Sequence, residues 1–219
     1  MKVNNGKSKN FSYKILTLGD QFVGKTSLIE RYVNNSFRSN YLLTIGMDKR
    51  NKRLDINGND IDIFITDTAG EERFRAITKM FYKQADGILV GFSLTEKKSL
   101  ESVNYWIEQI QANCSKEYPV SLVLVGNKCD DKDHIQVDKK EIDELKQKYG
   151  LEYFETSAKE DINVKEVFEY LTKLVIKSRG NLKDLGYKND VNFEEIIIKE
   201  KENQKIEEYK KIPKKKKFC

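Results

Sequence analysis

Short apolar runs alternate with amphipathic stretches along most of this chain. Continuous apolar runs are typical of buried strands, whereas apolar positions three and four residues apart are typical of helices with one buried face. Regular alternation of these two kinds of segment predicts an α/β fold with a mainly parallel sheet. The expected strands are 13–18, 49–56, 61–66, 87–94, 120–125 and 152–154, and the helices that can be placed are 24–34, 97–113, 138–149 and 164–177.

One pair of expected strands departs from the parallel pattern. Asn57-Gly58-Asn59-Asp60 joins 49–56 to 61–66, and an Asn-Gly pair between alternating strands is a strong hairpin signal. We therefore expect an α/β fold with a six-stranded, mostly parallel sheet, one antiparallel hairpin and about five flanking helices.

The apolar pattern fades near both ends of the chain. It predicts a domain at 11–178, preceded by a flexible N-terminus at 1–10 and followed by a flexible tail at 179–219. Residues 193–209 are compatible with a short charged helix, because Glu and Lys recur at suitable spacing, but their composition favours a linker.

Composition and charge exclude several classes of protein. No run of eighteen apolar residues is present, so we expect no membrane-spanning helix, and the polar first ten residues do not resemble a secretory signal. The three cysteines lack the spacing of a metal clip or a redox pair, which favours a cytosolic chain. Of the net charge of +5, most lies in the tail, where 210–217 holds six lysines and no acid. Such a short cluster suits an anionic membrane surface better than nucleic acid.

The segment after the first expected strand carries a phosphate-binding pattern. Its sequence, GDQFVGKT, matches GxxxxGKT between a strand and a helix. In such a loop, backbone N–H groups and the helix N-terminus hold phosphates, Lys25 reaches the outer phosphates, and Thr26 offers a hydroxyl to Mg²⁺. Within an α/β domain, this pattern predicts the P-loop NTPase type of fold. The expected nucleotide contacts here are Gly19, Asp20, Gln21, Phe22, Val23, Gly24, Lys25, Thr26 and Ser27.

Two later segments indicate which base is bound. Asn127-Lys128-Cys129-Asp130 follows the strand 120–125, at the sheet edge where ligands bind in open α/β folds. The Asp130 carboxylate can accept both the ring N–H and the exocyclic amine of guanine, a donor pair that adenine lacks. Thr156-Ser157-Ala158-Lys159 follows the next strand. The expected base contacts are Asn127, Lys128, Asp130, Ser157, Ala158 and Lys159.

A carboxylate after the strand 61–66 completes the predicted site. Asp67 begins the sequence Asp67-Thr68-Ala69-Gly70 and is expected to bind Mg²⁺, commonly through water. Gly70 has a backbone N–H that can meet a γ-phosphate, and a glycine can move when that phosphate leaves.

These motifs resemble, over residues 13–177, those of Ras-superfamily small GTPases and of the Rab family among them. The Rab resemblance rests on TIG at 44–46, RFRAIT at 73–78 and FYK at 81–83. It implies a Mg²⁺-dependent GTP/GDP switch in vesicle trafficking, with an exchange factor, a GTPase-activating protein, a prenyl chaperone and effectors as partners. It also implies that Thr44 joins Thr26 and Asp67 around Mg²⁺, that Tyr41 contacts the nucleotide, and that Phe37 stacks on the guanine.

The chain departs from the family at the residue that orients the attacking water. Glu71 stands where a glutamine is usual, and a carboxylate adds negative charge beside the triphosphate and cannot donate to the transition state. With Glu71, Gly70 and Lys25 as the candidate catalytic groups, we expect slow intrinsic turnover. The alternative is a GTP-binding interaction module with little hydrolysis. A metabolic ATPase or kinase is disfavoured, because Asp130 argues against adenine.

Two further departures concern partners and the membrane. Lys49 and Thr66 replace the Phe and Trp that Rabs often present to effectors, which leaves Tyr82 as the expected aromatic there. The end of the chain, with Cys219 after a lysine run, resembles prenylated Rab tails. This resemblance implies geranylgeranylation at Cys219 and peripheral attachment to the cytosolic face of an intracellular membrane. Because one lipid chain binds weakly, the basic patch would supply the second signal.

Overall fold

The computed structural model describes residues 11–39, 47–56, 59–68, 75–114, 119–181 and 185, with only the backbone given for 75–79. These residues form one six-stranded sheet in the order β2-β3-β1-β4-β5-β6. Among the described strands, β2 and β3 are antiparallel and all other neighbours are parallel, which confirms the expected fold class. The strands are β1 (Phe11–Leu18), β2 (Met47–Ile56), β3 (Asn59–Thr68), β4 (Gly87–Ser93), β5 (Ser121–Asn127) and β6 (Tyr153–Thr156).

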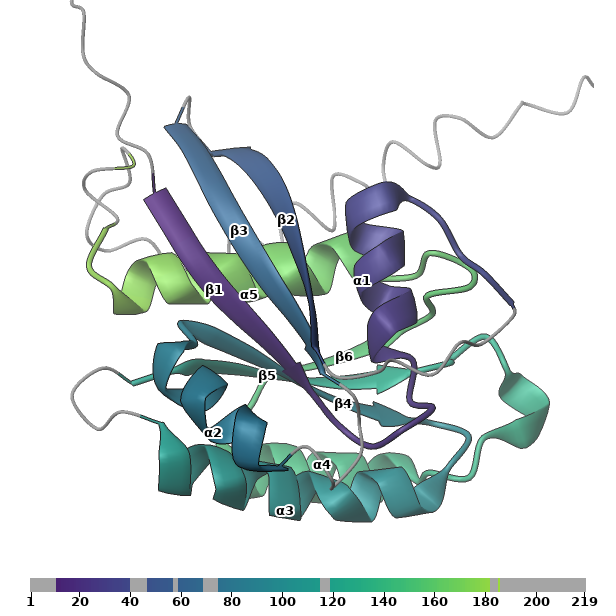
Figure 1. Ribbon diagram of the computed structural model, residues 1–219. Helices are drawn as coiled ribbons and strands as arrows, with labels where there is room; N and C mark the ends of the chain where they lie inside the picture. Colours follow the sequence, from purple (N-terminus) through teal and green to yellow (C-terminus); the bar gives the residue numbers. More distant parts are fainter. Residues whose placement is uncertain are drawn as a thin grey trace, which may run out of the picture.

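Helices cover both faces of the sheet (Figure 1). One buried cluster joins α1 and α5 to one face, and a second joins α2, α3 and α4 to the other. The placement of β4 and β5 between these layers explains why they carry polar residues only at their ends, since strands covered on both faces have no polar side. The helices are α1 (Lys25–Asn34), α2 (Arg75–Gln84), α3 (Lys97–Asn113), α4 (Lys139–Tyr149) and α5 (Val164–Ser178).

The expected number of about five helices is confirmed, but α2 was not placed from the sequence. Its length of ten residues is not the reason, because α1 has the same length and was placed from its position after the phosphate-loop pattern. The strand β3 is also longer than expected. Its pairing with β2 continues to Thr68 opposite Met47, so Asp67 lies within the strand and does not follow it. The Asn57-Gly58 connection of the hairpin lies outside the described residues.

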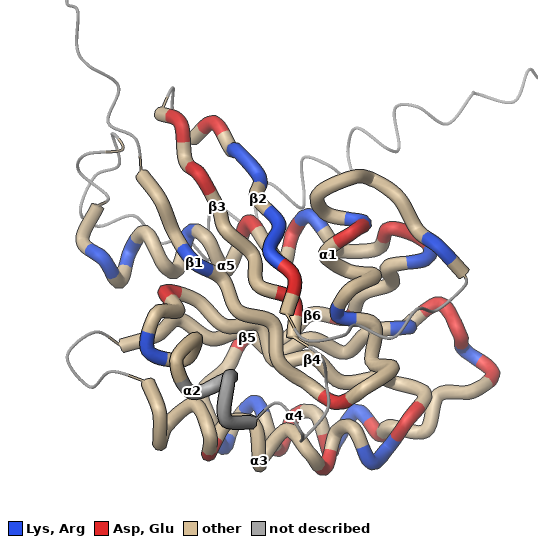
Figure 2. The backbone as a smooth tube through the Cα atoms, viewed as in Figure 1, with Lys and Arg blue, Asp and Glu red and all other residues tan. Residues whose placement is uncertain are grey.

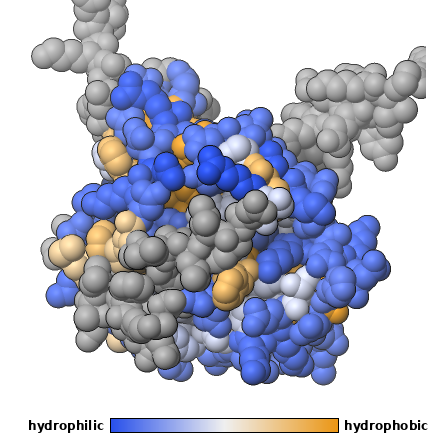
Figure 3. Space-filling view, turned by 45° about the vertical axis from the view of Figure 1, so that its right-hand side comes forward, coloured by the Kyte–Doolittle hydropathy of each residue, from blue (hydrophilic) through white to orange (hydrophobic). Residues whose placement is uncertain are grey.

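Charged residues are frequent in the β2–β3 hairpin and in the helices but absent from the strands β4 and β5, as Figure 2 shows. The described surface in Figure 3 is accordingly mostly hydrophilic, with small, separate hydrophobic patches. Within the described ranges, no helix has the length and apolar character needed to cross a bilayer.

Candidate nucleotide-binding site

The loop between β1 and α1 requires glycine at two positions. Gly19 has a φ of 140°, and a Cβ there would lie 2.1 Å from the carbonyl oxygen of Gly91 in β4. Gly24, the N-cap of α1, has a φ of 95°, and a Cβ there would lie 2.3 Å from the Asn127 side-chain nitrogen. Both positions combine a left-handed backbone with close packing, so no other residue fits without displacement. The loop therefore lies tightly against β4 and β5.

The ammonium group of Lys25 is enclosed by this loop. The residue is 6% exposed, and its Nζ donates to the carbonyl oxygens of Gly19 (2.9 Å) and Asp20 (2.8 Å). Burial disfavours the charged form and lowers the pKa of Lys25 to about 8, although the nearby carboxylates of Asp67 and Asp20 oppose this shift. An ammonium has three N–H donors, so the third can be given to a ligand. A buried cation with a spare donor suits a phosphate oxygen.

A hydroxyl and a carboxylate meet beside Lys25. The Thr26 hydroxyl donates to Oδ2 of Asp67 at 2.6 Å, and Asp67 is only 2% exposed. Hydroxyl and carboxylate oxygens are hard donors, which fit Mg²⁺ when substrate phosphates complete its coordination. The part of the chain that the structure describes holds no cluster of three His, Cys, Asp or Glu residues able to bind a metal unaided. The pair therefore fits a metal ion that arrives with a phosphate ligand.

The carboxylate of Asp130 is held at the opposite end of the site. The Ser157 hydroxyl donates to Oδ1 of Asp130 at 2.6 Å, and the Lys159 ammonium lies 3.8 Å from Oδ2. The Ser157 oxygen in turn accepts the backbone N–H of Glu160 at 2.9 Å. Lys128 precedes this carboxylate with a φ of 68°, an uncommon conformation outside glycine. These contacts fix the orientation of the Asp130 carboxylate.

Asn127 connects the two ends. It is 3% exposed, and its Nδ2 donates to the carbonyl oxygen of Val23 at 2.8 Å. Its Oδ1 accepts the Thr156 hydroxyl (3.2 Å) and the Ala158 N–H (3.3 Å). One side chain thus bonds the phosphate loop to both segments expected at the base. The structure brings these three motifs together.

Two supporting residues were not found from the sequence. On α3, the Trp106 indole donates to Oδ1 of Asp20 at 2.9 Å. On α1, Arg31 donates to the carbonyl oxygens of Ala158 (2.9 Å) and Lys159 (3.0 Å). The available signal was weak: Trp106 falls on the apolar face of α3, and a buried indole N–H usually needs an acceptor.

The remaining predicted residues are exposed, half-buried or outside the described part of the chain. Phe22 is 51% exposed with a φ of 61°, and Phe37 lies after α1 and is 36% exposed. Gln21 and Ser27 are half-buried in the loop and in the first turn of α1. Several predicted residues lie outside the described part of the chain: Tyr41, Thr44, Gly70, Glu71 and Cys219.

The expectation that Tyr82 faces a partner is wrong. Tyr82 is 3% exposed and belongs to the core cluster beneath α2. Successive helical residues point about 100° apart, so the turn that buries Tyr82 directs its neighbour Phe81 elsewhere. Phe81 instead lines an open surface with Lys49 and Thr66.

The loop between β1 and α1 requires glycine at two positions, and Asn127 connects it to the segment that carries the Asp130 carboxylate. This arrangement is typical of nucleotide-binding proteins of the P-loop class. The family model described as the Ras family matches residues 14–177. The chain therefore belongs to the Ras family, and its relatives place it in the Rab group of small GTPases.

Three relatives illustrate this similarity. The Ras-related protein Rab-13 of Bos taurus is 40% identical over 175 residues, which cover 80% of this chain and 85% of the relative. Rab-27B of Rattus norvegicus is 40% identical over 178 residues, covering 77% and 81% respectively. Rab-8A of Bos taurus is 38% identical over 167 residues, covering 76% and 80%.

Proposed function

We propose that this chain is a GTP/GDP-controlled switch of intracellular vesicle trafficking that hydrolyses GTP slowly. The observation that carries the proposal is the set of three hydrogen bonds made by the Asn127 side chain. These bonds hold the proposed phosphate site and the proposed base site at a fixed distance from each other. A guanine nucleotide has an anionic end and a base with two adjacent donors, so it fits both ends at once. GTP and GDP are the proposed ligands, with Mg²⁺ as the cofactor.

At the phosphate end, the proposed roles follow from charge. Lys25 would donate to the outer phosphates, whose negative charge would offset the desolvation of its ammonium group. Thr26 and Asp67 would hold Mg²⁺, together with Thr44 of the switch segment, and this ion would neutralise charge on the phosphates. Residues of the loop from Gly19 to Ser27 would supply backbone N–H donors.

At the base end, Asp130 would accept the ring N–H and the exocyclic amine of guanine. Its carboxylate is already oriented by Ser157, so little ordering cost remains on binding. Lys128, Ala158 and Lys159 would line the base, and Phe37 would stack on it. An adenine nucleotide would leave the carboxylate without its donor pair, which is a strong basis for discrimination.

Hydrolysis is the step at which this chain would differ from its relatives. Glu71, the counterpart by resemblance of a water-orienting glutamine, would bring a negative charge toward a transition state that Lys25 and the Gly70 N–H stabilise. We therefore propose a low intrinsic rate. The second candidate function, a GTP-binding interaction module with little or no hydrolysis, is favoured by the same residue.

One experiment separates these two functions: measurable conversion of bound GTP to GDP by the unsubstituted chain supports the slow switch, whereas GTP that stays intact supports the binding module. Nucleotide extracted from the purified chain should be GDP or GTP, and single-turnover hydrolysis should accelerate by about tenfold or more in Glu71→Gln. The matched control is Glu72→Gln, the same change one residue away, which should leave the rate unaltered. Equal rates for the unsubstituted chain and Glu71→Gln would count against the proposed role of Glu71. Adenine nucleotide in the extract would overturn the proposal as a whole.

We further propose that the domain at 11–178 acts at the cytosolic face of an intracellular membrane, attached through the tail at 179–219. The six lysines of 210–217 would bind anionic lipid at about 1 kcal/mol each, and a geranylgeranyl group on Cys219 would supply the apolar anchor. An exchange factor, a GTPase-activating protein, a prenyl chaperone and effectors are the proposed partners, and nucleic acid is not. Intact-mass spectrometry of the chain from its own cells should show one added isoprenoid. An unmodified mass would refute membrane attachment through a lipid on Cys219.

A further inference from the structure

The phosphate loop carries an acidic side chain at Asp20. The residue is half-buried, and its carbonyl oxygen accepts the Lys25 ammonium at 2.8 Å, so it lies in the part of the loop proposed to meet phosphates. Burial lowers the pKa of Lys25, and the Asp20 carboxylate is one of two charges that oppose this shift, so its charge reaches the ammonium group. Like charges repel strongly where water is partly excluded. An unrestrained carboxylate at Asp20 would therefore work against phosphate binding.

A tryptophan on α3 holds this carboxylate. The Trp106 indole N–H donates to Oδ1 of Asp20 at 2.9 Å. Trp106 is 9% exposed, belongs to the core cluster on this face of the sheet, and packs edge-on against Tyr105 with ring centres 5.3 Å apart. A hydrogen bond to an ionised acceptor is about twice as strong as one between neutral groups. The carboxylate of Asp20 is thus bonded to a fixed donor on α3, while the carbonyl oxygen of the same residue is bonded to Lys25.

We propose that Trp106 is a positioning residue of the nucleotide site, which holds the Asp20 carboxylate against α3 and away from the bound phosphates. It acts through Asp20 and has no contact of its own with the nucleotide. The benefit is larger for GTP than for GDP, because GTP carries one more negative charge. The inference rests on the proposed function only in taking phosphate groups as the ligand of the loop, and it does not depend on which base is bound.

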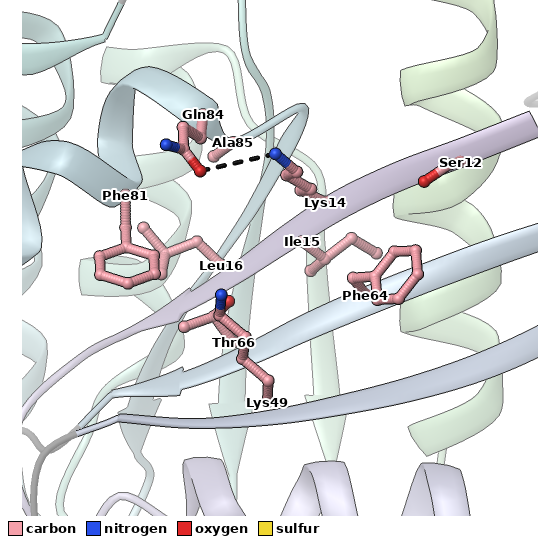
Figure 4. Close-up of a pocket in the computed structure, with 10 residues that line it drawn as sticks. All are labelled: Ser12, Lys14, Ile15, Leu16, Lys49, Phe64, Thr66, Phe81, Gln84 and Ala85. Atoms are coloured by element: carbon pink, nitrogen blue, oxygen red, sulfur yellow. Dashed lines mark hydrogen bonds between the residues drawn. The ribbon is translucent and has the colours of Figure 1, made fainter.

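The alternative role for this bond is purely structural, since a buried indole N–H usually needs an acceptor. In that role the bond stabilises the fold, and its loss weakens the site whether or not Asp20 is charged. Positioning differs in one respect: the effect of Trp106 on nucleotide affinity then depends on the charge of Asp20. Neither residue lines the open pocket between α2 and the strands β1, β2 and β3 (Figure 4), so changes to this pair leave the lining of that pocket intact.

Removing the indole donor tests the size of the effect. In the full-length chain with Mg²⁺, Trp106→Phe should weaken a non-hydrolysable GTP analogue by about tenfold and GDP by about threefold, because the released carboxylate repels the phosphates. Competition against a fluorescent GDP analogue measures both affinities. The matched control is Ile110→Ala, one turn further along the buried face of α3, which should lower the free energy of unfolding and leave both affinities unchanged. Unchanged affinities in Trp106→Phe, or equal losses for the two nucleotides, would overturn the proposal.

Removing the charge of Asp20 separates positioning from a structural role. Asp20→Asn keeps an acceptor for the indole but has no negative charge, so affinity for the GTP analogue should rise by about twofold. When Asp20→Asn is already present, adding Trp106→Phe should change this affinity by less than about twofold, against about tenfold in the chain that keeps Asp20. A tenfold loss in both backgrounds would assign Trp106 a purely structural role and overturn the proposal.

The indole signal tests the bond without removing Trp106. The chain contains one tryptophan, so its indole N–H gives a single NMR signal in the isotopically labelled chain. With GDP or the GTP analogue bound, this proton should lie downfield and exchange slowly with water, and it should move upfield in Asp20→Asn. The position and rapid exchange of a free indole in both loaded forms would overturn the proposal, even if Trp106→Phe did not fold.

The same measurements distinguish failure of this inference from failure of the proposed function. If the unsubstituted chain bound neither GDP nor the GTP analogue, the proposed function and this inference would both be overturned. Nucleotide binding that does not respond to Trp106→Phe would overturn this inference alone.

Discussion

At the phosphate end of the site the chain buries a cation, whereas at the base end it holds an anion that already has donors. Lys25 is 6% exposed and its pKa is lowered to about 8, so its charged form is disfavoured by its surroundings. Asp130 accepts the Ser157 hydroxyl and lies near the Lys159 ammonium. The comparison suggests that the phosphate end depends on its ligand for stability, while the base end is organised beforehand.

Removing the buried cation should abolish most of the nucleotide affinity. Lys25→Met keeps the length of the side chain but loses the charge-assisted bond to phosphate, so GDP affinity should fall by about 100-fold or more. Isothermal calorimetry measures this loss. Lys98→Met is the control, because Lys98 is exposed on α3 and should leave GDP affinity unchanged. A loss of less than tenfold would mean that the backbone donors, and not Lys25, dominate phosphate binding.

The same substitution should have the opposite effect on the nucleotide-free fold. The pKa of Lys25 is about 8 in the folded chain against 10.5 for an ordinary lysine, which corresponds to a cost of about 3 kcal/mol for keeping the buried group charged. Lys25→Met removes that cost, so its free energy of unfolding at pH 7 should be higher. Chemical denaturation of the two nucleotide-free chains measures the difference.

The pH dependence of this difference follows from proton linkage. Between about pH 8 and 10.5 the folded chain has released the Lys25 proton and the unfolded chain still binds it. The free energy of unfolding of the unsubstituted chain should therefore rise with pH in this window. The difference in free energy of unfolding between Lys25→Met and the unsubstituted chain should be constant below about pH 8 and should shrink above it. If the free energies of unfolding of the two chains changed in parallel between about pH 8 and 10.5, the lowered pKa of Lys25 would be contradicted.

At the base end, a change of charge should alter selectivity more than folding. Asp130→Asn can still accept the Ser157 hydroxyl, but it offers guanine one acceptor in place of two, so GDP affinity should fall by about 30-fold. Most of the preference for GDP over ADP should disappear, as competition calorimetry would show. Asp131→Asn, whose carboxylate pairs with His134, is the neighbouring control. A GDP preference that persists in Asp130→Asn would place base recognition elsewhere.

The parts of the site that could be predicted from sequence are those in which one short segment carries its own chemistry. GDQFVGKT predicts a phosphate loop because the glycines, the lysine and the hydroxyl act within eight residues. The sheet order places Asp130 at the same edge by a general rule for open α/β folds. The hairpin was likewise predictable, because the Asn-Gly signal is local.

The parts that could not be predicted depend on contacts between distant segments. Trp106 reaches Asp20 across 86 residues of sequence, and Arg31 reaches Ala158 across 127. The extension of β3 through Asp67 depends on its register with β2. The orientation of Phe81 and Tyr82 depends on how α2 is rotated against the sheet, which is a tertiary contact. Local motifs therefore identify the ligand groups, but tertiary packing decides what supports them.

The smallest expected effect concerns backbone strain in the phosphate loop. Phe22 adopts a φ of 61°, where a non-glycine residue pays roughly 1–2 kcal/mol, while a glycine adopts the same conformation freely. Phe22→Gly and Phe22→Ala both remove the ring, but only the glycine relieves the strain. After the extra unfolded-state entropy of glycine is subtracted, Phe22→Gly should be more stable than Phe22→Ala by about 0.5–1 kcal/mol in nucleotide-free denaturation. Equal stabilities would show that the left-handed conformation at Phe22 costs nothing.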